Sequence, residues 1–455
     1  MTGGQSAGGD QSGRALVVGL GVAGEAAAHR LRERGWSVVV VEDHPGDASR
    51  LRSASLAAKG VVTHERPRSD ELAGLVAGCD LVVPSPPVPP SHPGVALALA
   101  TGVPVWSEFE LAARWSSLPL VAITGTNGKT TVTTLVERML AASGLRTVSA
   151  GNNDLPLIEA LDGEADLDLV VVEASSFRLQ FTERFCPAVG TWLNQAEDHL
   201  DWHPTMEHYA LAKSRVWTAQ GPDEVAIANA EDPVVSALAS TVRSRLVTFG
   251  LRTGDWRVEG DRLVMPDGAT LLRVGAMWRS LPHDLANALA AAATALAAGA
   301  SIDAVRTTLR SFRGLPHRLS FLAEHQGVAY YDDSKATDPH AAAAAVAGFA
   351  SVVLIAGGRN KGLDLSPLAA LADRIRAVVA IGEAGGEIER VFAGLVPVTV
   401  ATSMDEAVAA SRATARAGDA VLLSPGCASF DWYSSYGERG DDFARAVAEL
   451  VGGGT

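Results

Sequence analysis

The residues best suited to chemistry lie in the segment Gly125-Thr-Asn-Gly-Lys-Thr-Thr131, which follows an apolar stretch, residues 118–123, expected to be a buried strand. Apolar residues at helical spacing come next, so we predict a helix that begins at the Lys-Thr-Thr end. At such a junction backbone N–H groups and the helix dipole bind phosphate, Lys129 can reach terminal phosphate oxygens, and the Thr130 hydroxyl can ligate Mg²⁺. We therefore predict an ATP-binding loop, with a glycine-rich turn as the alternative. The loop is shorter than the common phosphate-binding loop, because Ile123 stands where its first glycine would be.

Two side chains that follow expected strands are candidates for contact with a metal ion. Glu173 ends an expected strand over residues 167–172, and a carboxylate there, beside a phosphate loop, is placed to hold Mg²⁺. A helix cap or a surface acid is the alternative for Glu173. His199 lies between Asp198 and Asp201 in a polar loop, and we expect it to work near a metal ion or a phosphate.

Lys213 falls within the apolar face of a predicted helix rather than opposite it. Pro204 suits the first position of that helix. Lysine is rarely buried unless it is paired or functional, so Lys213 is a candidate site residue. The alternative is that its aliphatic stem covers apolar surface while the amine reaches water. His203, just before the helix, is expected to be structural.

The N-terminal segment carries the spacing G-x-G-x-x-G at residues 19–24, between an expected strand and an expected helix. Glu42 and Asp43 follow at the end of the next strand, about 20 residues on. This pattern predicts a Rossmann-like unit with a phosphate-bearing ligand at the helix N-terminus. NAD and a nucleotide-sugar are both compatible with it, and so is a unit that has no ligand.

The C-terminal part predicts a further parallel sheet with one ligand-binding edge. Its expected strands are residues 328–331, 352–355, 378–381 and 420–423. Each strand is followed by a loop rich in polar residues or glycine, namely residues 332–337, 357–362, 382–383 and 424–431. Ligands bind beyond the carboxyl ends of strands in open parallel sheets, so we expect these loops to form one surface.

The composition limits the classes of function. The net charge of −14 argues against a nucleic-acid partner. The three cysteines, Cys79, Cys186 and Cys427, have neither metal-binding nor disulfide spacing, and the sequence has no apolar run of membrane length and no signal peptide. We therefore expect a cytoplasmic protein with no membrane insertion.

Together these patterns predict an α/β protein of three domains: an N-terminal Rossmann-like domain, a central phosphate-loop ATPase with a parallel sheet, and a C-terminal Rossmann-like domain. The expected boundaries are a disordered tail at 1–13, then domains at 14–105, 106–314 and 315–455. Short antiparallel strands are expected around residues 251–280, before an alanine-rich helix that ends at residue 298.

The assembled motifs resemble those of the Mur ligase family. They span residues 19 to 440 and are Gly125-Thr-Asn-Gly-Lys-Thr-Thr131, Glu173-Ala-Ser-Ser-Phe177, Asp198-His-Leu-Asp201, Ala212-Lys213, His283-Asp-Leu-Ala-Asn287, His317-Arg318, Asp333-Ser-Lys-Ala-Thr337, Gly357-Gly-Arg-Asn-Lys361 and Ser424-Pro-Gly-Cys-Ala-Ser-Phe-Asp431. The resemblance implies an ATP-dependent ligase of peptidoglycan precursor synthesis. ATP would phosphorylate the carboxylate of UDP-N-acetylmuramoyl-L-alanine, and the amine of glutamate would attack the acyl phosphate. It also implies two Mg²⁺ ions and a monomer.

The resemblance assigns roles to individual residues. Lys129, Glu173, His199 and Lys213 match catalytic positions, and Thr130, Glu173, His199 and a carbamylated Lys213 match metal ligands. ATP contacts are implied for Gly125, Thr126, Asn127, Gly128, Lys129, Thr130, Thr131, Asn287, Arg318, Asp333 and Lys335. Contacts to the UDP substrate are implied for Leu20, Gly21, Val22, Asp43, His44 and Asn152. Contacts to glutamate are implied for Thr337, Lys361, Ser429, Phe430 and Tyr436.

Several residues depart from the family pattern. Pro87 stands where glycine is frequent beside the diphosphate, and Asp284 stands where asparagine is usual near the adenine. Asn153 and Asp154 replace an apolar residue and a glycine, and Arg359 replaces a small or acidic residue. These departures concern contacts to substrate and leave the expected reaction class unchanged.

The residues leave other functions open. Folylpolyglutamate synthase shares the phosphate loop and the lysine, although the unit at residues 19–24 has no place in it. An NAD-dependent oxidoreductase with an accessory ATPase domain would use Glu42 and Asp43 but would leave the C-terminal loops without a role. A nucleotide-binding regulatory protein would not need Lys129, Glu173 and Lys213 together. The sequence does not distinguish D- from L-glutamate as the amine substrate, because both carry the same charges.

Overall fold

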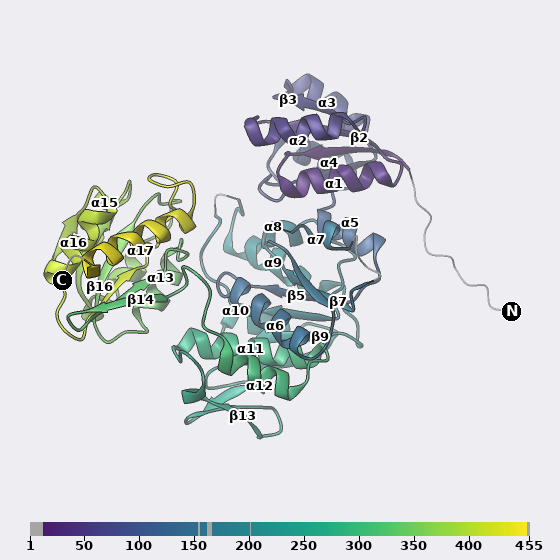
Figure 1. The fold of residues 1–455 in the computed structure, drawn as a ribbon. Coiled ribbons are helices and arrows are strands. Elements are labelled where there is room, and N and C mark those ends of the chain that lie inside the picture. The colour runs from purple at the N-terminus through teal and green to yellow at the C-terminus, as the bar shows by residue number, and fades with distance from the viewer. Residues whose placement is uncertain (1–11, 153–154, 162–165, 201, 453–455) are drawn as a thin grey trace. The chain divides into compact units, whose positions relative to one another are not determined.

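The computed structural model describes residues 12–152, 155–161, 166–200 and 202–452 (Figure 1). The chain divides into two compact units, each treated by itself below. The first unit holds residues 1–195, 202–274 and 286–310, and the second holds residues 196–201, 275–285 and 311–455. Most of the predicted tail, residues 1–13, lies outside the described residues.

The N-terminal sheet of the first unit has four parallel strands in the order β3-β2-β1-β4. They are β1 (Arg14–Val18), β2 (Ser37–Glu42), β3 (Val62–Glu65) and β4 (Leu81–Pro84). The helices that alternate with them are α1 (Val22–Glu33), α2 (Asp47–Ala57), α3 (Ser69–Ala77) and α4 (Pro93–Thr101). Successive residues of β1 enter different cores: Ala15 and Val17 one, Leu16 and Val18 another. An unbroken apolar run therefore forms this strand, because both faces of the sheet are covered.

The central sheet is parallel throughout and has six strands in the order β10-β9-β8-β5-β7-β6. They are β5 (Leu120–Thr124), β6 (Thr147–Gly151), β7 (Leu169–Glu173), β8 (Val189–Trp192), β9 (Val225–Asn229) and β10 (Arg245–Phe249). The surrounding helices are α5 (Glu108–Trp115), α6 (Lys129–Ala142), α7 (Leu157–Ala160), α8 (Ser176–Leu179), α9 (Met206–Thr218) and α10 (Pro233–Ala239). β5 is central, so the loop that follows it lies between the ends of β7 and β8.

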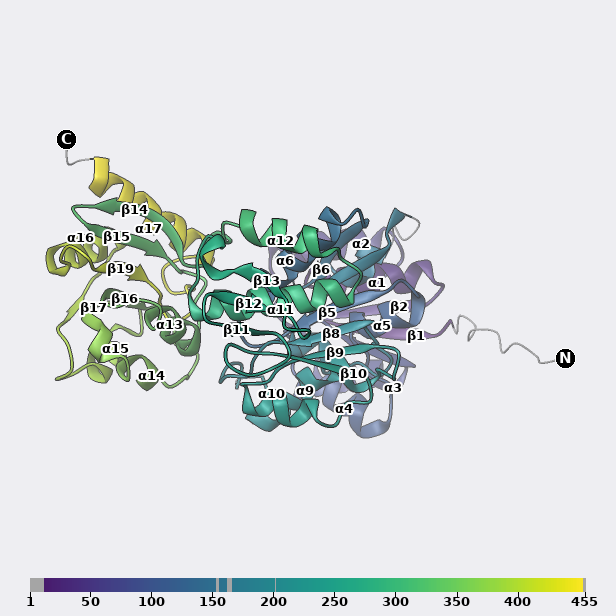
Figure 2. The ribbon, with the colours of Figure 1, turned by 90° about the horizontal axis from the view of Figure 1, so that it is seen from below.

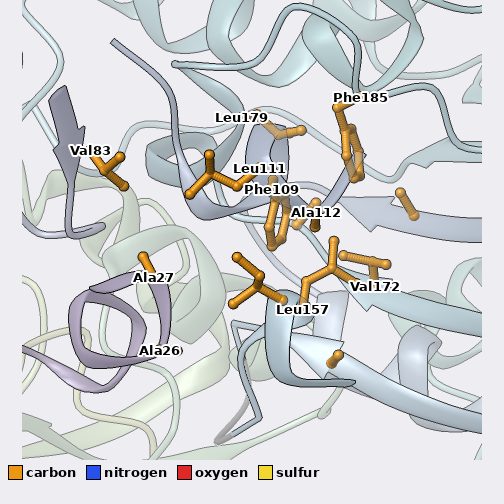
Figure 3. Packing of buried hydrophobic residues seen from close by; sticks show 14 of the residues in the cluster. Ala26, Ala27, Val83, Phe109, Leu111, Ala112, Leu157, Val172, Leu179 and Phe185 are labelled. Atoms are coloured by element: carbon orange, nitrogen blue, oxygen red, sulfur yellow. The ribbon is translucent and has the colours of Figure 1, made fainter. Parts of the chain in front are cut away.

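One apolar cluster joins α1 of the N-terminal sheet to the central sheet (Figure 3). Phe109 and Ala112 of α5 pack with Leu157 of α7 and with Ala27 of α1. Phe109 also stacks on Phe185, with ring centroids 5.1 Å apart. Burial of two aromatic rings contributes several kcal/mol of hydrophobic stabilisation. This cluster therefore stabilises the packing of α1, α5 and α7 with the central sheet.

The chain then forms the expected antiparallel segment and the alanine-rich helix. The strands are β11 (Arg257–Glu259), β12 (Arg262–Val264) and β13 (Thr270–Arg273), followed by the short helix η2 (Val274–Ala276). The helices α11 (Pro282–Ala297) and α12 (Ile302–Ser311) complete the region. Residues 288–293 of α11 are all buried, which explains why small alanine side chains fill most of them.

The sheet of the second unit has six strands in the order β14-β15-β19-β16-β17-β18, and only β14 is antiparallel (Figure 2). The strands are β14 (Ser320–His325), β15 (Val328–Asp332), β16 (Val352–Gly357), β17 (Ile375–Ile381), β18 (Val398–Val400) and β19 (Ala420–Leu423). The helices are α13 (Pro339–Val346), α14 (Ser366–Ala369), η3 (Ala372–Arg374), α15 (Gly385–Val391), α16 (Met404–Thr414) and α17 (Tyr436–Gly452). Alternate strand residues enter two cores, one under α13, α14 and α15 and the other under α16 and α17.

The predicted α/β class with its three domains is confirmed, whereas the exact domain boundaries stay a prediction. The prediction that Pro204 begins a helix is wrong: α9 begins at Met206, and the Thr205 side chain caps it by accepting from the amide of His208 at 3.1 Å. Among the described residues, no helix is long and apolar enough to cross a membrane.

Candidate active site

The loop between β5 and α6 has the backbone geometry that the sequence predicts. Gly125 has φ 156° and Gly128, the N-cap of α6, has φ 85°. A Cβ atom at position 128 would lie 2.6 Å from Oδ1 of Asn287, so glycine is required for close approach as well as for its conformation. The loop therefore brings Asn287, a predicted ATP contact, against the N-terminus of α6. Lys129 folds over the loop and donates from Nζ to the carbonyls of Gly125 and Thr126, both at 2.8 Å.

Asn194, which follows β8, fastens this loop from the other side. Its Oδ1 accepts from the amides of Thr126 at 3.1 Å and Asn127 at 2.9 Å, and its Nδ2 donates to the carbonyl of Asn127 at 3.1 Å. The carbonyl of Asn194 also accepts from the amide of Thr126. One side chain thus fixes two consecutive peptide units, which leaves the amides at the start of α6 to face an anion.

Lys213 is buried, with 1% of its surface exposed, as its place on an apolar helix face indicates. Its Nζ donates to Oγ1 of Thr126 at 3.0 Å and to Oε1 of Gln195 at 2.9 Å. Nζ also lies 3.4 Å from the centroid of the Tyr209 ring. The lysine therefore contacts the phosphate loop directly, and the alternative of an amine reaching water is wrong.

Glu173, at the end of β7, is 3% exposed and lies in register with Ile123 of β5. Its Oε1 accepts from Nδ2 of Asn152 at 3.1 Å, so a predicted metal ligand and a predicted UDP-substrate residue are joined. Thr130 lies in the first turn of α6, the helix that follows β5, and β5 is the strand next to β7. Within the described ranges, no group of three or more His, Cys, Asp or Glu side chains is arranged to hold a metal ion.

The N-terminal glycine loop forms as expected and engages Glu42. The two carboxylate oxygens of Glu42 accept from the amides of Leu20 at 2.7 Å and His44 at 2.8 Å. Such an acid stabilises its own loop, which weakens the reading in which it binds the ribose of NAD. Asp43 Oδ2 lies 2.7 Å from Nε2 of His92. Leu20 is buried and its side chain belongs to the apolar core, so the structure does not place that side chain toward a ligand.

The remaining N-terminal positions show how closely the loop packs. A Cβ at position 24 would lie 2.2 Å from the carbonyl oxygen of Gly19, and one at position 21 would lie 3.4 Å from Oγ of Ser85. Val22 is exposed, and Pro87 lies exposed in the turn after β4. Asn153 and Asp154 lie outside the described residues.

In the second unit, the four predicted loops meet at one edge of the sheet. β15, β19, β16 and β17 are neighbours, and their loops are hydrogen-bonded to each other. Arg359 and Ala428 exchange two backbone hydrogen bonds, of 2.8 and 3.0 Å, and the amide of Glu383 donates to Oδ2 of Asp431 at 2.9 Å. The predicted common surface is therefore present within this unit. Arg359 itself pairs with Glu383 on the exposed side.

Asp333 is buried in the first of these loops. It accepts from Oγ of Ser424 at 2.8 Å and from the amide of Leu319 at 3.1 Å. Burial raises the pKa of the Asp333 carboxyl to about 7, against the smaller lowering effect of its hydrogen bonds. This carboxyl is thus partly protonated near neutral pH.

A buried arginine supports the same loop. Arg439 of α17 donates to Oγ and to the carbonyl of Ser334 at 2.9 and 2.7 Å, and to the carbonyl of Cys427 at 3.1 Å. Burial lowers the pKa of Arg439 to about 10. Even so, it stays charged at neutral pH and ties the loop after β15 to the loop after β19.

The residues predicted to contact the substrate glutamate all lie in the second unit. Lys335 Nζ lies 3.7 Å from the centroid of the Tyr436 ring, and Thr337 donates its amide to the carbonyl of Lys335 at 2.9 Å. Ser429 is buried, whereas Phe430 is 63% exposed.

Three further predicted site residues, Lys361, His199 and Arg318, belong to this unit. Lys361 Nζ lies 3.7 Å from Oδ1 of Asp198. His199, next in the chain, has φ 57°, a left-handed conformation, and its Nε2 lies 3.2 Å from Oδ2 of the same aspartate. Arg318 lies two positions before β14.

The departure at Asp284 has a structural counterpart. Arg279 donates to both carboxylate oxygens of Asp284, at 2.6 and 2.8 Å, and to the carbonyl of Leu319 at 2.5 Å. The carboxylate that replaces the expected asparagine is therefore neutralised by a neighbour in its own segment.

Asn194 and Gln195 are not identified as site residues from the sequence. The position directly after a buried strand, at the carboxyl edge of the sheet, was the available signal. His203 is structural as predicted: it is fully buried, lies 2.9 Å from Oγ of Ser176 and packs on Trp202.

Comparison with known proteins adds to this geometry. The model of the Mur ligase middle domain matches residues 123–295, and the model of the Mur ligase glutamate ligase domain matches residues 317–427. The UDP-N-acetylmuramoylalanine–D-glutamate ligase of Frankia casuarinae is 43% identical, over 96% of this chain and 94% of that protein. The ligase of the same name from Thermobifida fusca is 40% identical, over 96% of this chain and 99% of its own length.

This chain belongs to the Mur ligase family. Its fold agrees with that of the UDP-N-acetylmuramate–alanine ligase from Thermotoga maritima, with a TM-score of 0.58 and 19% identity over 96% of this chain and all of the other. As a Mur ligase it is expected to use ATP and Mg²⁺. The residues fit both: the glycine cradle at the start of α6 suits phosphates, and the buried Glu173 carboxylate with the Thr130 hydroxyl provides the oxygen donors that Mg²⁺ prefers.

Proposed function

We propose that this Mur ligase joins D-glutamate to UDP-N-acetylmuramoyl-L-alanine with hydrolysis of ATP to ADP and phosphate, in the synthesis of peptidoglycan precursors. The observation that carries the proposal is the phosphate loop braced by Asn194 and contacted by the buried Lys213. Relatives that carry this ligase name match nearly the whole chain at about 40% identity, which supports the choice of substrates.

The chemistry explains why such a loop is needed. A carboxylate is a poor electrophile, and ATP supplies the phosphoryl group that gives it a good leaving group. The amine of glutamate then attacks the acyl phosphate, and phosphate leaves as the amide forms. Two anions must approach each other in the first step, so Lys129 and the amides of α6 have to offset their repulsion.

We assign metal-binding roles to Thr130, Glu173, His199 and a carbamylated Lys213, with two Mg²⁺ ions in the reaction. Carbamylation turns an amine into a carboxylate-like ligand. It would therefore explain why a lysine is buried beside the phosphate loop. Asn287, Arg318, Asp333 and Lys335 would contact the nucleotide.

The two substrates of the ligation would bind at different loops. We assign the uridine nucleotide to Leu20, Gly21, Val22, Asp43, His44 and Asn152. We assign glutamate to Thr337, Lys361, Ser429, Phe430 and Tyr436, where Lys361 would balance one carboxylate. We assign the reaction to the cytoplasm, where ATP is supplied. We also propose that the protein acts as a monomer, as the resemblance to the family implies.

The test is phosphate release from ATP with substrates omitted one at a time. We expect release only when UDP-N-acetylmuramoyl-L-alanine and glutamate are both present, and little release from Lys129→Ala. Release with a folate and glutamate, without the uridine nucleotide, would instead support a folylpolyglutamate synthase and overturn the proposal.

A further inference from the structure

Gln195, three residues after the end of β8, contacts Lys213 through its side chain. Its Oε1 accepts from Nζ of Lys213 at 2.9 Å, and Thr126 Oγ1 accepts from the same Nζ at 3.0 Å. In this arrangement Lys213 is an ammonium donor, and the amide oxygen of Gln195 faces it.

The other end of the Gln195 amide is not satisfied. Its Nε2 is buried and has no hydrogen-bond partner among the residues that the structure describes. A buried amide donor without a partner carries a desolvation cost of about 1–3 kcal/mol. This Nε2 is one of twelve such side-chain atoms among the described residues, and it belongs to the residue whose oxygen contacts Lys213.

An amide side chain can present either end to a neighbour, because rotation about its last bond exchanges oxygen and nitrogen. Toward an ammonium the oxygen must face the lysine. Toward a carbamate, which only accepts at its oxygens, the nitrogen must face it. The unsatisfied Nε2 is the group that a carbamate on Lys213 would use.

We propose that Gln195 is a positioning residue for carbamylated Lys213. Nε2 of Gln195 donates to one carbamate oxygen, and the Thr126 hydroxyl also donates to the carbamate. This inference rests on the carbamylation assigned above. It adds that Gln195 sets how completely Lys213 is modified and how the carbamate is oriented.

The covalent step needs only carbon dioxide as a co-reactant. The lone pair of the neutral amine of Lys213 forms a bond to the carbon of CO₂, one C=O π bond becomes the carboxylate charge, and one N–H proton passes to solvent. Nothing is oxidised or reduced. Gln195 stabilises the product without taking part in the bond change, so its loss shifts the equilibrium towards the free amine.

The backbone of Gln195 is held firmly enough for this role. Its amide donates to Oδ2 of Asp232 at 2.7 Å, and Oδ1 of the same aspartate caps α10 by accepting from the amides of Val234 and Val235. Residue 195 is thus anchored to a helix N-terminus, and only its side chain is left to rotate.

The experiment measures the carbamate itself by ¹³C NMR of the full chain in ¹³C-labelled bicarbonate, without ATP or other substrates. Lys213→Arg identifies the signal by abolishing it. We expect Gln195→Met, which keeps the length of the side chain but lacks hydrogen bonds, to lower the carbamate occupancy about tenfold at fixed bicarbonate. We also expect its ligase activity to recover as bicarbonate is raised.

Gln220→Met is the matched control, since Gln220 is a buried glutamine whose Nε2 donates to the carbonyls of Pro187 and Val225. That variant should be less stable, yet carry the wild-type carbamate signal. Gln195→Glu is a second variant in case Gln195→Met does not fold. It should pair with the ammonium and carry less carbamate than Gln195→Met.

The outcomes distinguish the role of Gln195 from the carbamylation of Lys213. Equal carbamate occupancy in wild type, Gln195→Met and Gln195→Glu would overturn the role of Gln195 alone. No Lys213 signal in the wild type at saturating bicarbonate would overturn the carbamylation as well. Substrate-dependent phosphate release by the wild type tests the ligase function independently of both results.

Discussion

At the scale of single residues, Asn194 fastens the loop that we propose to bind ATP. Its three side-chain hydrogen bonds hold the Thr126–Asn127 segment of the loop. We predict that Asn194→Ala lowers kcat/KM for ATP by roughly 150-fold, because three hydrogen bonds of about 1 kcal/mol each are lost. Steady-state kinetics with varied ATP measure this.

The control for Asn194 is Asn229→Ala. Asn229 ends the neighbouring strand and donates to the carbonyl of Leu193 at 2.9 Å, but none of its described hydrogen bonds reaches the phosphate loop. A similar loss of kcat/KM for ATP in both variants would mean that Asn194 acts only through general stability.

Asp333 predicts a pH dependence of stability. Burial raises the pKa of its carboxyl from 3.8 to about 7 in the folded protein, so between these values the folded state holds a proton that the unfolded state has lost. The contribution of Asp333 to the free energy of unfolding therefore falls as pH rises through this window, with a limiting slope of about 1.4 kcal/mol per pH unit.

Asp333→Asn removes this titration but keeps an acceptor for the Leu319 amide and a partner for Ser424. We predict that the unfolding temperature of the variant gains on that of the wild type between pH 5 and about pH 8. Calorimetry of both proteins across this range measures the difference. A difference that does not change with pH would show that the carboxyl titrates normally.

The sequence allowed the phosphate loop, Glu173 and Lys213 to be identified as site candidates, because each has a residue type that is unusual at its place in a strand–loop–helix pattern. Asn194 and Gln195 could not be assigned in this way. Polar residues after a strand are common, and what distinguishes these two is the loop that a neighbouring strand brings next to them. That proximity is a property of the sheet order.

At the scale of elements, Gly128 at the start of α6 must be glycine for two reasons. Its backbone is left-handed, and Asn287 leaves no room for a side chain. We predict that Gly128→Ala lowers ATP affinity at least tenfold, because its Cβ would lie 2.6 Å from Oδ1 of Asn287 and push apart two parts of the cradle. A left-handed conformation also costs a non-glycine residue about 1–2 kcal/mol. Calorimetric titration with ATP and thermal unfolding measure the two effects.

Gly144→Ala is the control, since Gly144 follows the same helix with φ 88° and has no atom within 4 Å of an added Cβ. It should lose similar thermal stability and keep wild-type ATP affinity. If both variants lose ATP affinity equally, backbone strain in α6 is responsible rather than the contact with Asn287.

Strands and helices with strong apolar patterns were predicted well, whereas short edge elements were not. β14 and β18 lie at the two edges of the C-terminal sheet, where one side has no partner and polar residues are tolerated. The start of α9 was missed because the capping hydrogen bond of Thr205 outweighed the preference of Pro204 for a first helical position.

At the scale of the whole molecule, the described residues include two parallel sheets and one that is parallel apart from β14, each with a loop-rich carboxyl edge. The predicted uridine-nucleotide, ATP and glutamate residues follow the strands of the first, second and third sheet respectively, apart from Asn152 and a few ATP contacts. A ligase that joins two substrates with the free energy of ATP needs separate binding loops for the two substrates and for ATP. The fold class followed from the sequence because alternating βα patterns leave few arrangements open.

The central claim is that D-glutamate is joined to UDP-N-acetylmuramoyl-L-alanine. The most direct measurement supplies ATP, Mg²⁺ and the uridine nucleotide with D- or L-glutamate in parallel, and detects the product by mass while phosphate is counted. We expect one phosphate released for each amide formed with D-glutamate, and little product with L-glutamate. Equal or greater product from L-glutamate, or ATP hydrolysis without an amide product, would contradict it.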